Sequence, residues 1–310
     1  MEYGGASSGV SFLSNLCFMT PDGALADWRL TDCPRDAMQG WPAFIPTEIK
    51  VEYLSALLQV GFDVLDAGSF VSPKAIPQMA DTAAVFDALP GSPTHILAIV
   101  ANQRGADEAL SQGRADLIGF PFSISETFQQ RNAGSGIEEA WKRLEAIQNR
   151  TVQSGKELVV YLSMGFGNPY GDAWAPELVA EWSERLHREL GVGRLALSDT
   201  VGMATDDVVT SVFENVVGAL PQCEVGAHLH GRPERTLPLM QAAWNGGCRA
   251  FDGALGGHGG CPMAKDDLVG NLATEVMMHA PESWGVAPRT WNAEALQKAQ
   301  WIRASIFGGA

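Results

Sequence analysis

Short apolar runs alternate with longer amphipathic segments along most of the chain. Helix-length stretches such as 48–59 and 136–153 separate runs that are rich in Leu, Ile, Val, Ala and Phe. This alternation is typical of repeated βα units around a buried parallel sheet. The runs that predict strands lie at 28–31, 62–66, 95–100, 116–120, 158–162, 194–199, 224–228 and 249–252.

About eight such units predict a closed (β/α)8 barrel, the TIM barrel, as the fold class. A doubly wound open sheet is the alternative, and that fold usually carries a glycine-rich nucleotide-binding fingerprint after its first strand. The glycine-rich segment 165–171 has one residue too many for that fingerprint. We therefore expect a Gly- and Ser-rich arm at 1–25, the barrel at 26–283 and a short helical extension at 284–310. Residues 293–302 are amphipathic, so the extension is expected to pack on the barrel or on a partner subunit.

Composition and charge narrow the class of partner. The chain has 310 residues, of which 46% are hydrophobic, and a formal net charge of −15. Such a chain can bury a large core, and its charge argues against nucleic acid or an anionic membrane surface as a partner. No apolar run approaches the roughly 18 residues of a membrane-spanning helix. The five cysteines form no C-x-x-C pair, which favours a reducing compartment, and we expect a cytoplasmic protein.

Polar side chains gather at the ends of the predicted strands. In a barrel these ends form one face, which carries the active site in this fold. The residues concerned are Arg35, Asp36, Asp66, Asp199, His228 and His230. Alternate side chains of an extended strand share a face, so His228 and His230 are expected to point the same way and to form half of a metal site. Histidine has structural uses too, but a glycine-rich loop with Cys261 follows, and such loops let reactive groups approach a ligand.

Six segments carry a more specific pattern, in both their order and their spacing along the chain. They are Pro34–Gln39, Ser69–Lys74 with Pro77–Asp81, Ser198–Gly202, His228–His230 and Gly259–Ala264. Together they resemble the motifs of the 3-hydroxy-3-methylglutaryl-CoA lyase family, from about Leu30 to about Glu275. The wider superfamily of metal-dependent aldol and Claisen enzymes on TIM barrels shares only the Arg-Asp pair and the two histidines. The Ser-Phe-Val-Ser-Pro-Lys and Gly-Gly-Cys-Pro segments indicate the lyase branch.

The resemblance implies a divalent metal ion. Carried over by position, the ligands of the family fall on Asp36, His228, His230 and Asn271. Two imidazoles, one carboxylate and one amide oxygen, with room for water and substrate oxygens, suit Mg²⁺ or Mn²⁺. Zinc is a weaker candidate, because octahedral sites without sulfur are unusual for it.

The resemblance also implies a reaction, the cleavage of a 3-hydroxyacyl-CoA between C2 and C3 to acetyl-CoA and a 3-oxo acid such as acetoacetate. Arg35 would stabilise the enolate by a charge-assisted hydrogen bond, and Cys261 would protonate it. Asp66 and Asp199 would orient ligands or carry the hydroxyl proton, and the sequence does not choose between these roles. His228 belongs to the catalytic set as well as to the ligands.

The coenzyme A part of the substrate is expected to contact segments that resemble those of the family. The candidate residues are polar and follow the early predicted strands: Lys74, Asn102, Arg104, Ser125 and Asn132. Members of the family are commonly dimers, so a homodimer is expected.

Several positions depart from the family motifs and bear on the shape of the substrate. Asp66 stands where glutamate is usual, Ala37 follows the Arg-Asp pair in place of glycine, Trp41 is a bulky replacement, and His258 replaces a leucine. The acyl group is therefore open, and a lyase with another acyl substrate is one alternative. A Claisen-type synthase that joins acetyl-CoA to a 2-oxo acid is a second, and a non-catalytic binding protein is a third.

Overall fold

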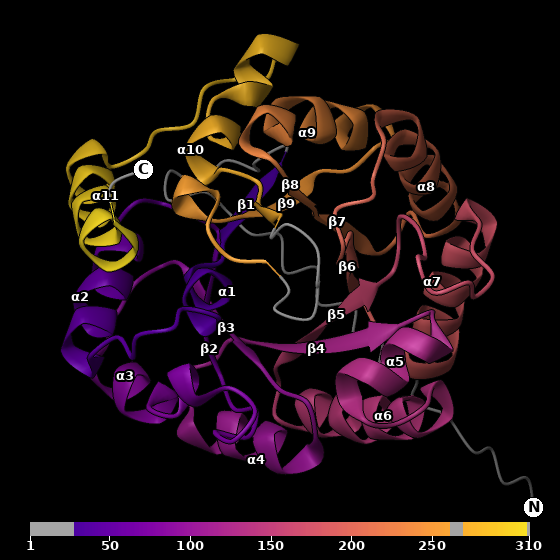
Figure 1. Ribbon diagram of the computed structural model, residues 1–310, viewed down its shortest axis with the longest axis horizontal. Helices are drawn as coiled ribbons and strands as arrows, with labels where there is room; N and C mark the ends of the chain where they lie inside the picture. Colours follow the sequence, from indigo (N-terminus) through magenta and orange to yellow (C-terminus); the bar gives the residue numbers. More distant parts are fainter. Residues whose placement is uncertain (1–27, 261–268, 309–310) are drawn as a thin grey trace, which may run out of the picture.

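The computed structural model describes residues 28–260 and 269–308. Within these ranges, eight parallel strands close into a barrel in sequence order, and helices surround it (Figure 1). The last strand pairs with the first, and Leu30 lies opposite Phe251 at this closure. The predicted TIM barrel is confirmed. Its strands are β1 (Arg29–Asp32), β2 (Val64–Ser69), β3 (His95–Ile99), β4 (Leu117–Ser123), β5 (Glu157–Ser163), β6 (Arg194–Ser198), β7 (Glu224–His228) and β9 (Ala250–Gly253).

The helices cover the outside of the barrel (Figure 1). The longer ones are α2 (Thr47–Leu57), α4 (Gln103–Gln112), α6 (Ile137–Gln153), α7 (Pro176–Leu190), α8 (Asp206–Ala219), α9 (Thr236–Asn245) and α11 (Ala293–Phe307). The shorter ones are α1 (Pro34–Gln39), η1 (Pro77–Met79), α3 (Thr82–Ala88), α5 (Glu126–Ala133), η2 (Pro233–Arg235), η3 (Leu255–Gly257), α10 (Thr274–Met277) and η4 (Ala280–Trp284). None of the helices in the described part of the chain is long and apolar enough to cross a bilayer.

The strands are buried on both faces, which explains why their sequences read as apolar runs rather than as alternating patterns. One apolar cluster fills the barrel and another, much larger, lies between strands and helices. The inner cluster consists of Val64, Leu97, Ile99, Leu117, Tyr161 and Ala196.

The second strand differs from its prediction. The sequence analysis placed Asp66 at the end of this strand, but β2 continues to Ser69. Its pairing with β3 shifts between Asp66 and Gly68, as in a β-bulge. A bulge re-aims the side chains beside it, and Asp66 is fully buried near the carboxyl ends of the strands.

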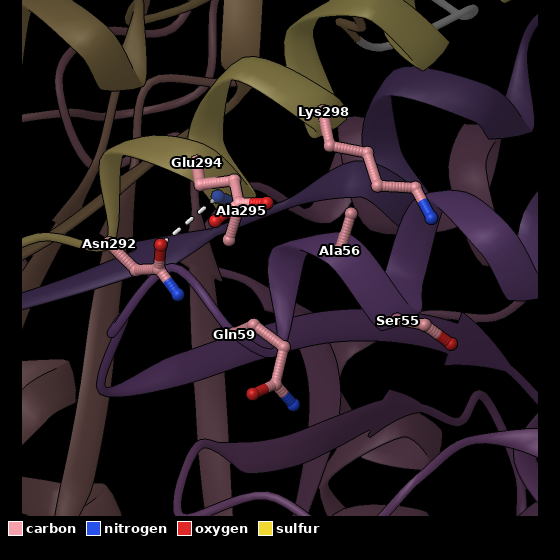
Figure 2. A pocket seen from close by; sticks show the side chains of 7 residues that line it. All are labelled: Ser55, Ala56, Gln59, Asn292, Glu294, Ala295 and Lys298. Atoms are coloured by element: carbon pink, nitrogen blue, oxygen red, sulfur yellow. Dashed lines mark hydrogen bonds between the residues drawn. The ribbon is translucent and has the colours of Figure 1, made fainter.

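The expected C-terminal helix is present as α11. It packs beside α2 (Figure 1). Its buried residues are Ala299, Ile302 and Phe307. A pocket between the two helices is lined by Ser55, Ala56, Gln59, Asn292, Glu294, Ala295 and Lys298 (Figure 2). None of these seven residues belongs to the predicted site, so the pocket plays no part in the chemistry below.

Candidate active site

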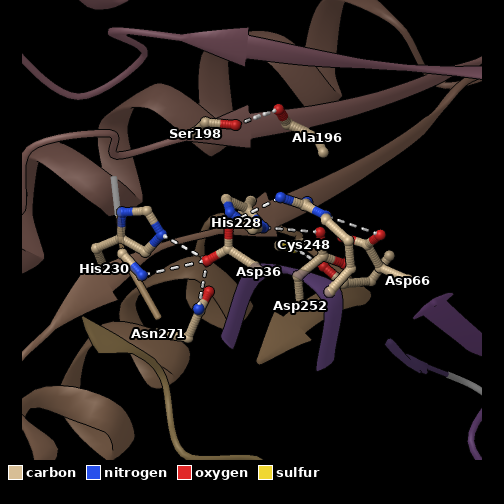
Figure 3. A network of polar contacts seen from close by, with 12 residues as sticks. Asp36, Asp66, Ala196, Ser198, His228, His230, Cys248, Asp252 and Asn271 are labelled. Atoms are coloured by element: carbon tan, nitrogen blue, oxygen red, sulfur yellow. Dashed lines mark hydrogen bonds and ion pairs between the residues drawn. The ribbon is translucent and has the colours of Figure 1, made fainter. Parts of the chain in front are cut away.

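Three of the four predicted metal ligands converge at the carboxyl end of the barrel. Asp36, His228 and His230 each offer a ligand atom, and these atoms all lie within 4.8 Å of one another. Asn271 joins them through its side chain, which donates to Asp36 Oδ2 over 2.7 Å. Figure 3 shows the four side chains around one point. The geometry on which the predicted metal site depends is therefore present.

A small second sheet brings Asn271 to the histidines. β8 (His230–Gly231) and β10 (Gly270–Asn271) form an antiparallel pair in which Asn271 lies directly opposite His230. Strands of two residues leave no periodic pattern in a sequence, so this sheet was not predicted. This pairing brings Asn271, which lies far along the chain, to the rim of the barrel next to His230.

Asp36 is the centre of the polar network. It lies in α1, directly after β1, and Pro34 occupies the first turn of this helix, where its missing N–H is tolerated. Its Oδ1 accepts from Gln39 Nε2 at 2.6 Å and from Arg35 Nη1 at 3.0 Å. Burial alone would raise its pKa, but Arg35 and the two imidazoles hold the pKa of Asp36 well below its ordinary value. The carboxylate is therefore ionised and ready to bind a cation.

His230 and Asn271 carry buried polar atoms that hydrogen bonding within the described residues leaves unsatisfied. Both ring nitrogens of His230 and the Oδ1 atom of Asn271 lack a hydrogen-bond partner there, which is costly unless something else binds them. Burial, followed by His228, lowers the pKa of His230 to about 4, so its ring is neutral near pH 7. Neutral imidazole and amide oxygen are ligands for a divalent ion. These residues thus fit the ion that the sequence implied.

Asp252 is a site residue that the sequence analysis missed. Nδ1 of His228 donates to Oδ2 of Asp252 over 3.1 Å, which leaves Nε2 as the ligand atom (Figure 3). Burial works against protonation of His228, but the hydrogen bond and charge of Asp252 outweigh it and raise the pKa of His228. Asp252 lies near the end of the predicted strand 249–252, so the strand-end argument used for Asp199 would have found it.

A second cluster shares one histidine with the first. Cys33, His228 and Asp252 also bring ligand atoms within 4.8 Å of one another. Burial raises the pKa of the Cys33 thiol, with Asp252 as the next contributor, so the sulfur stays protonated. A protonated thiol is a poor ligand. This favours the Asp36 cluster as the cation site.

Arg35 is held by two carboxylates. Its Nε lies 3.1 Å from both carboxylate oxygens of Asp66, its Nη2 donates to Asp66, and its Nη1 donates to Asp36. Burial opposes the charge of Arg35, but Asp66 and then Asp36 raise its pKa, so it remains a cation. A guanidinium has five N–H donors, and these contacts leave donors for a substrate oxygen.

Asp199 lies beside the histidines. It follows Ser198, which pairs with His228 between β6 and β7. Its carboxylate accepts from the backbone N–H groups of Met203 and Ala204, at 3.0 and 2.9 Å. Burial raises the pKa of Asp199 to about 6 against these bonds. The group is thus suited both to capping the loop and to exchanging a proton near neutral pH.

The remaining candidates lie in the segments that follow β2, β3 and β4. Asn102 and Ser125 cap α4 and α5, by accepting from Gly105 N and Phe128 N. Ser125 is fully buried and its hydroxyl donates to Asp172 over 2.5 Å. Their roles in binding coenzyme A stay predictions. The exposed candidates are Lys74, Arg104 and Asn132. Cys261 lies outside the described residues.

Comparison with known proteins agrees with this geometry. The HMGL-like family model matches residues 29–302, and the chain belongs to that family of barrel enzymes. It is 33% identical to a hydroxymethylglutaryl-CoA lyase of Bacillus subtilis over 88% of this chain and 91% of that protein. It is 32% identical to a cytoplasmic 3-hydroxy-3-methylglutaryl-CoA lyase of the rat, over 82% of this chain and 73% of the relative.

Comparison with solved structures indicates the same family. An HMG-CoA lyase from Acinetobacter baumannii, in complex with coenzyme A and 3-methylmalate, superimposes with a TM-score of 0.82 at 28% identity. The match covers 92% of this chain and 93% of that one. The HMG-CoA lyase of Bacillus subtilis gives a TM-score of 0.83 at 31% identity, over 90% of this chain and 93% of the other. The predicted resemblance to this family is confirmed.

Proposed function

We propose that this enzyme is a carbon–carbon lyase that cleaves 3-hydroxy-3-methylglutaryl-CoA, or a close 3-hydroxyacyl-CoA, to acetyl-CoA and acetoacetate or the matching 3-oxo acid. The observation that carries the proposal is the convergence of Asp36, His228, His230 and Asn271 on one point beside Arg35. Relatives named as 3-hydroxy-3-methylglutaryl-CoA lyases, at about one-third identity, support it.

The proposal includes a divalent ion, Mg²⁺ or Mn²⁺, held by these four side chains. The unsatisfied atoms of His230 and Asn271 and the ionised carboxylate of Asp36 support this choice. The absence of a thiolate from the set supports a hard ion over zinc. When bound, such an ion supplies Lewis acidity that lowers the pKa of a substrate hydroxyl.

The side chains then divide the proton and charge transfers between them. Asp199, with its pKa of about 6, takes the proton of the C3 hydroxyl as that carbon becomes a ketone. The C2–C3 bond breaks, and its electron pair moves into the thioester as an enolate. Arg35 donates to the enolate oxygen, and Asp66 holds the guanidinium in place. Cys261 gives its proton to C2, which completes acetyl-CoA.

A Claisen-type synthase that uses the reverse bond change is the second candidate. The Arg-Asp pair and the two histidines serve both reactions, so they do not separate the two. The cysteine segment 259–264 favours the lyase, because it belongs to the motifs of that branch.

Product analysis tests the proposal. The purified protein, loaded with Mg²⁺ or Mn²⁺, is incubated with a panel of 3-hydroxyacyl-CoA thioesters, and the products are identified by mass spectrometry with and without chelator. We expect acetyl-CoA and a 3-oxo acid from 3-hydroxy-3-methylglutaryl-CoA, and their loss with chelator. Release of free coenzyme A from acetyl-CoA and a 2-oxo acid, without cleavage of any thioester in the panel, would instead establish the synthase.

We also propose that the protein is a cytoplasmic homodimer. The unbridged thiols of Cys33, Cys223 and Cys248 and the cytoplasmic relative of the rat support the location. The homodimer is carried over from the family, and light scattering on the purified protein tests it.

A further inference from the structure

The last turn of α11 contacts the glycine-rich segment 256–260 through aromatic rings. The ring of Phe307 stacks on the ring of His258, with centroids 4.5 Å apart and planes 25° from parallel. Trp41 meets the same phenyl ring edge-on, with centroids 5.1 Å apart. Phe307 is buried although it is the last residue of its helix. The end of α11 is thus fixed between the segment after α1 and the segment after β9.

A hydrogen bond reinforces this contact. Arg303, one turn earlier on α11, donates from Nη1 to Nε2 of His258 over 2.8 Å. Burial and the nearby guanidinium lower the pKa of His258, so the ring is neutral and its nitrogen accepts. Gly256 has φ +72°, and a Cβ atom there would lie 2.2 Å from Nη1 of Arg303. Glycine is therefore required for this close approach.

The backbone of His258 contacts the candidate ligand Asn271. Its carbonyl oxygen accepts from Nδ2 of Asn271 over 2.9 Å, while Oδ2 of Asp36 accepts from the same nitrogen over 2.7 Å. With both protons of the amide used, Oδ1 is left buried and without a hydrogen-bond partner in the described residues. These two acceptors determine which way the amide faces. One of these acceptors is the carbonyl oxygen of His258, and His258 is the residue that Phe307 and Arg303 of α11 contact.

Trp41 and His258 are both departures from the family motifs, and they lie far apart in the sequence. The structure brings both onto Phe307. The two departures from the motifs thus belong to one local packing arrangement.

We propose that α11 positions the metal site: Phe307 and Arg303 hold His258, and the carbonyl of His258 keeps the amide oxygen of Asn271 turned toward the cation. Phe307 and Arg303 are positioning residues, because they act on Asn271 through His258. This inference rests on the metal site of the proposed function. It adds Phe307 and Arg303 to the residues that determine the affinity of that site for a divalent ion.

The test is a titration of the full-length protein with Mn²⁺ alone, followed by electron paramagnetic resonance, for the wild type and Phe307→Ala. Ligand-orienting partners are worth about 10- to 100-fold in metal affinity, and Phe307 acts one contact further out. We therefore expect Mn²⁺ binding about 3- to 10-fold weaker in Phe307→Ala. The control is Trp301→Ala, because Trp301 lies on the same helix with its side chain 69% exposed. It should bind Mn²⁺ as the wild type does.

Amide hydrogen exchange of residues 255–260 provides a second readout in the same proteins. Phe307→Ala should speed exchange there, and Trp301→Ala should not. Where Phe307→Ala does not fold, Phe307→Leu carries the test, because it keeps apolar volume but loses the stacking ring. Wild-type affinity in the folded Phe307 variant would overturn the positioning role and leave the metal site intact. A wild type that does not bind Mn²⁺ would overturn the metal site itself, and the positioning role with it.

Discussion

Nδ1 of His228 lies 3.1 Å from Oδ2 of Asp252, and both side chains are buried. The carboxylate fixes which ring nitrogen carries the proton, so Nε2 is the nitrogen that remains for a cation. His228 is the last residue of β7 and Asp252 the penultimate residue of the adjacent strand β9, and the two lie opposite each other in the pairing of these strands. The pairing register of the barrel therefore sets the orientation of a candidate ligand.

Asp252→Asn should weaken metal binding without unfolding the protein. The amide keeps the shape of the carboxylate but loses the charge that raises the pKa of His228 and orients its ring. We expect Mn²⁺ affinity to fall by about 10- to 100-fold, measured by calorimetry. Asp87→Asn, at an exposed position, is the control and should leave the affinity unchanged. Equal affinity in Asp252→Asn and the wild type would contradict the orienting role of Asp252.

Arg35→Lys should separate catalysis from binding. Lysine keeps a positive charge beside Asp66, so the buried carboxylate is not left unpaired, but an ammonium cannot reproduce the planar contacts of a guanidinium. We expect kcat to fall at least about 100-fold, with KM and Mn²⁺ affinity within about threefold of the wild type. Steady-state kinetics and metal titration measure these quantities, with the exposed Arg188→Lys as the control. A variant with near-normal kcat would remove Arg35 from the mechanism.

Much of the fold follows from the sequence because buried parallel strands leave continuous apolar runs. Every predicted run contains or overlaps a barrel strand, and the predicted helix 136–153 corresponds to α6. The end of β2 was misplaced at Asp66 because the strand continues to Ser69 past a register shift that has no signal in the pattern. Asp36 and the two histidines were found because they end or closely follow the apolar runs that became β1 and β7.

The site itself was predictable only in part. The resemblance supplied Asn271, but its position opposite His230 depends on a pair of two-residue strands that no periodicity reveals. Contacts between distant segments were equally invisible, as with Thr274, whose hydroxyl donates to Asp32 over 2.6 Å. The sequence analysis gave Asp32 no role. The structure shows it as a buried carboxyl with a consequence for stability.

Asp32 should make the stability of the protein fall as pH rises. Burial, with a smaller opposing effect of its bond from Thr274, raises the pKa of Asp32 from 3.8 to about 7. The folded state therefore binds the proton more tightly than the unfolded state. The contribution of Asp32 to stability is complete below about pH 4 and is lost as pH rises through about 7.

Asp32→Asn removes this titration. The unfolding free energy of the variant relative to the wild type should increase by on the order of 2 kcal/mol between pH 5 and pH 8. Urea unfolding at the two pH values measures it, and comparing differences cancels the cost of the new amide. Asp87→Asn should show the same difference from the wild type at both pH values. Parallel pH profiles for Asp32→Asn and the wild type would show that Asp32 does not titrate in this range.

Gly259→Ala should damage the metal site through a direct clash. A Cβ atom at Gly259 would lie 2.5 Å from Nδ2 of Asn271 and 2.9 Å from Oδ2 of Asp36. These distances are too short for packing, so the amide and the carboxylate must both move. We expect Mn²⁺ affinity to fall by at least about 10-fold, as measured by calorimetry.

Backbone strain must be separated from this clash, because Gly259 has φ +103° and alanine is strained there in any surroundings. Gly113→Ala is the matched control: its φ is +79°, and a Cβ atom there meets nothing within 4 Å. Both variants should lose about 1–2 kcal/mol of stability to the left-handed conformation, but only Gly259→Ala should lose metal affinity. Equal Mn²⁺ binding by the two variants would show that Gly259 does not pack closely against Asp36 and Asn271.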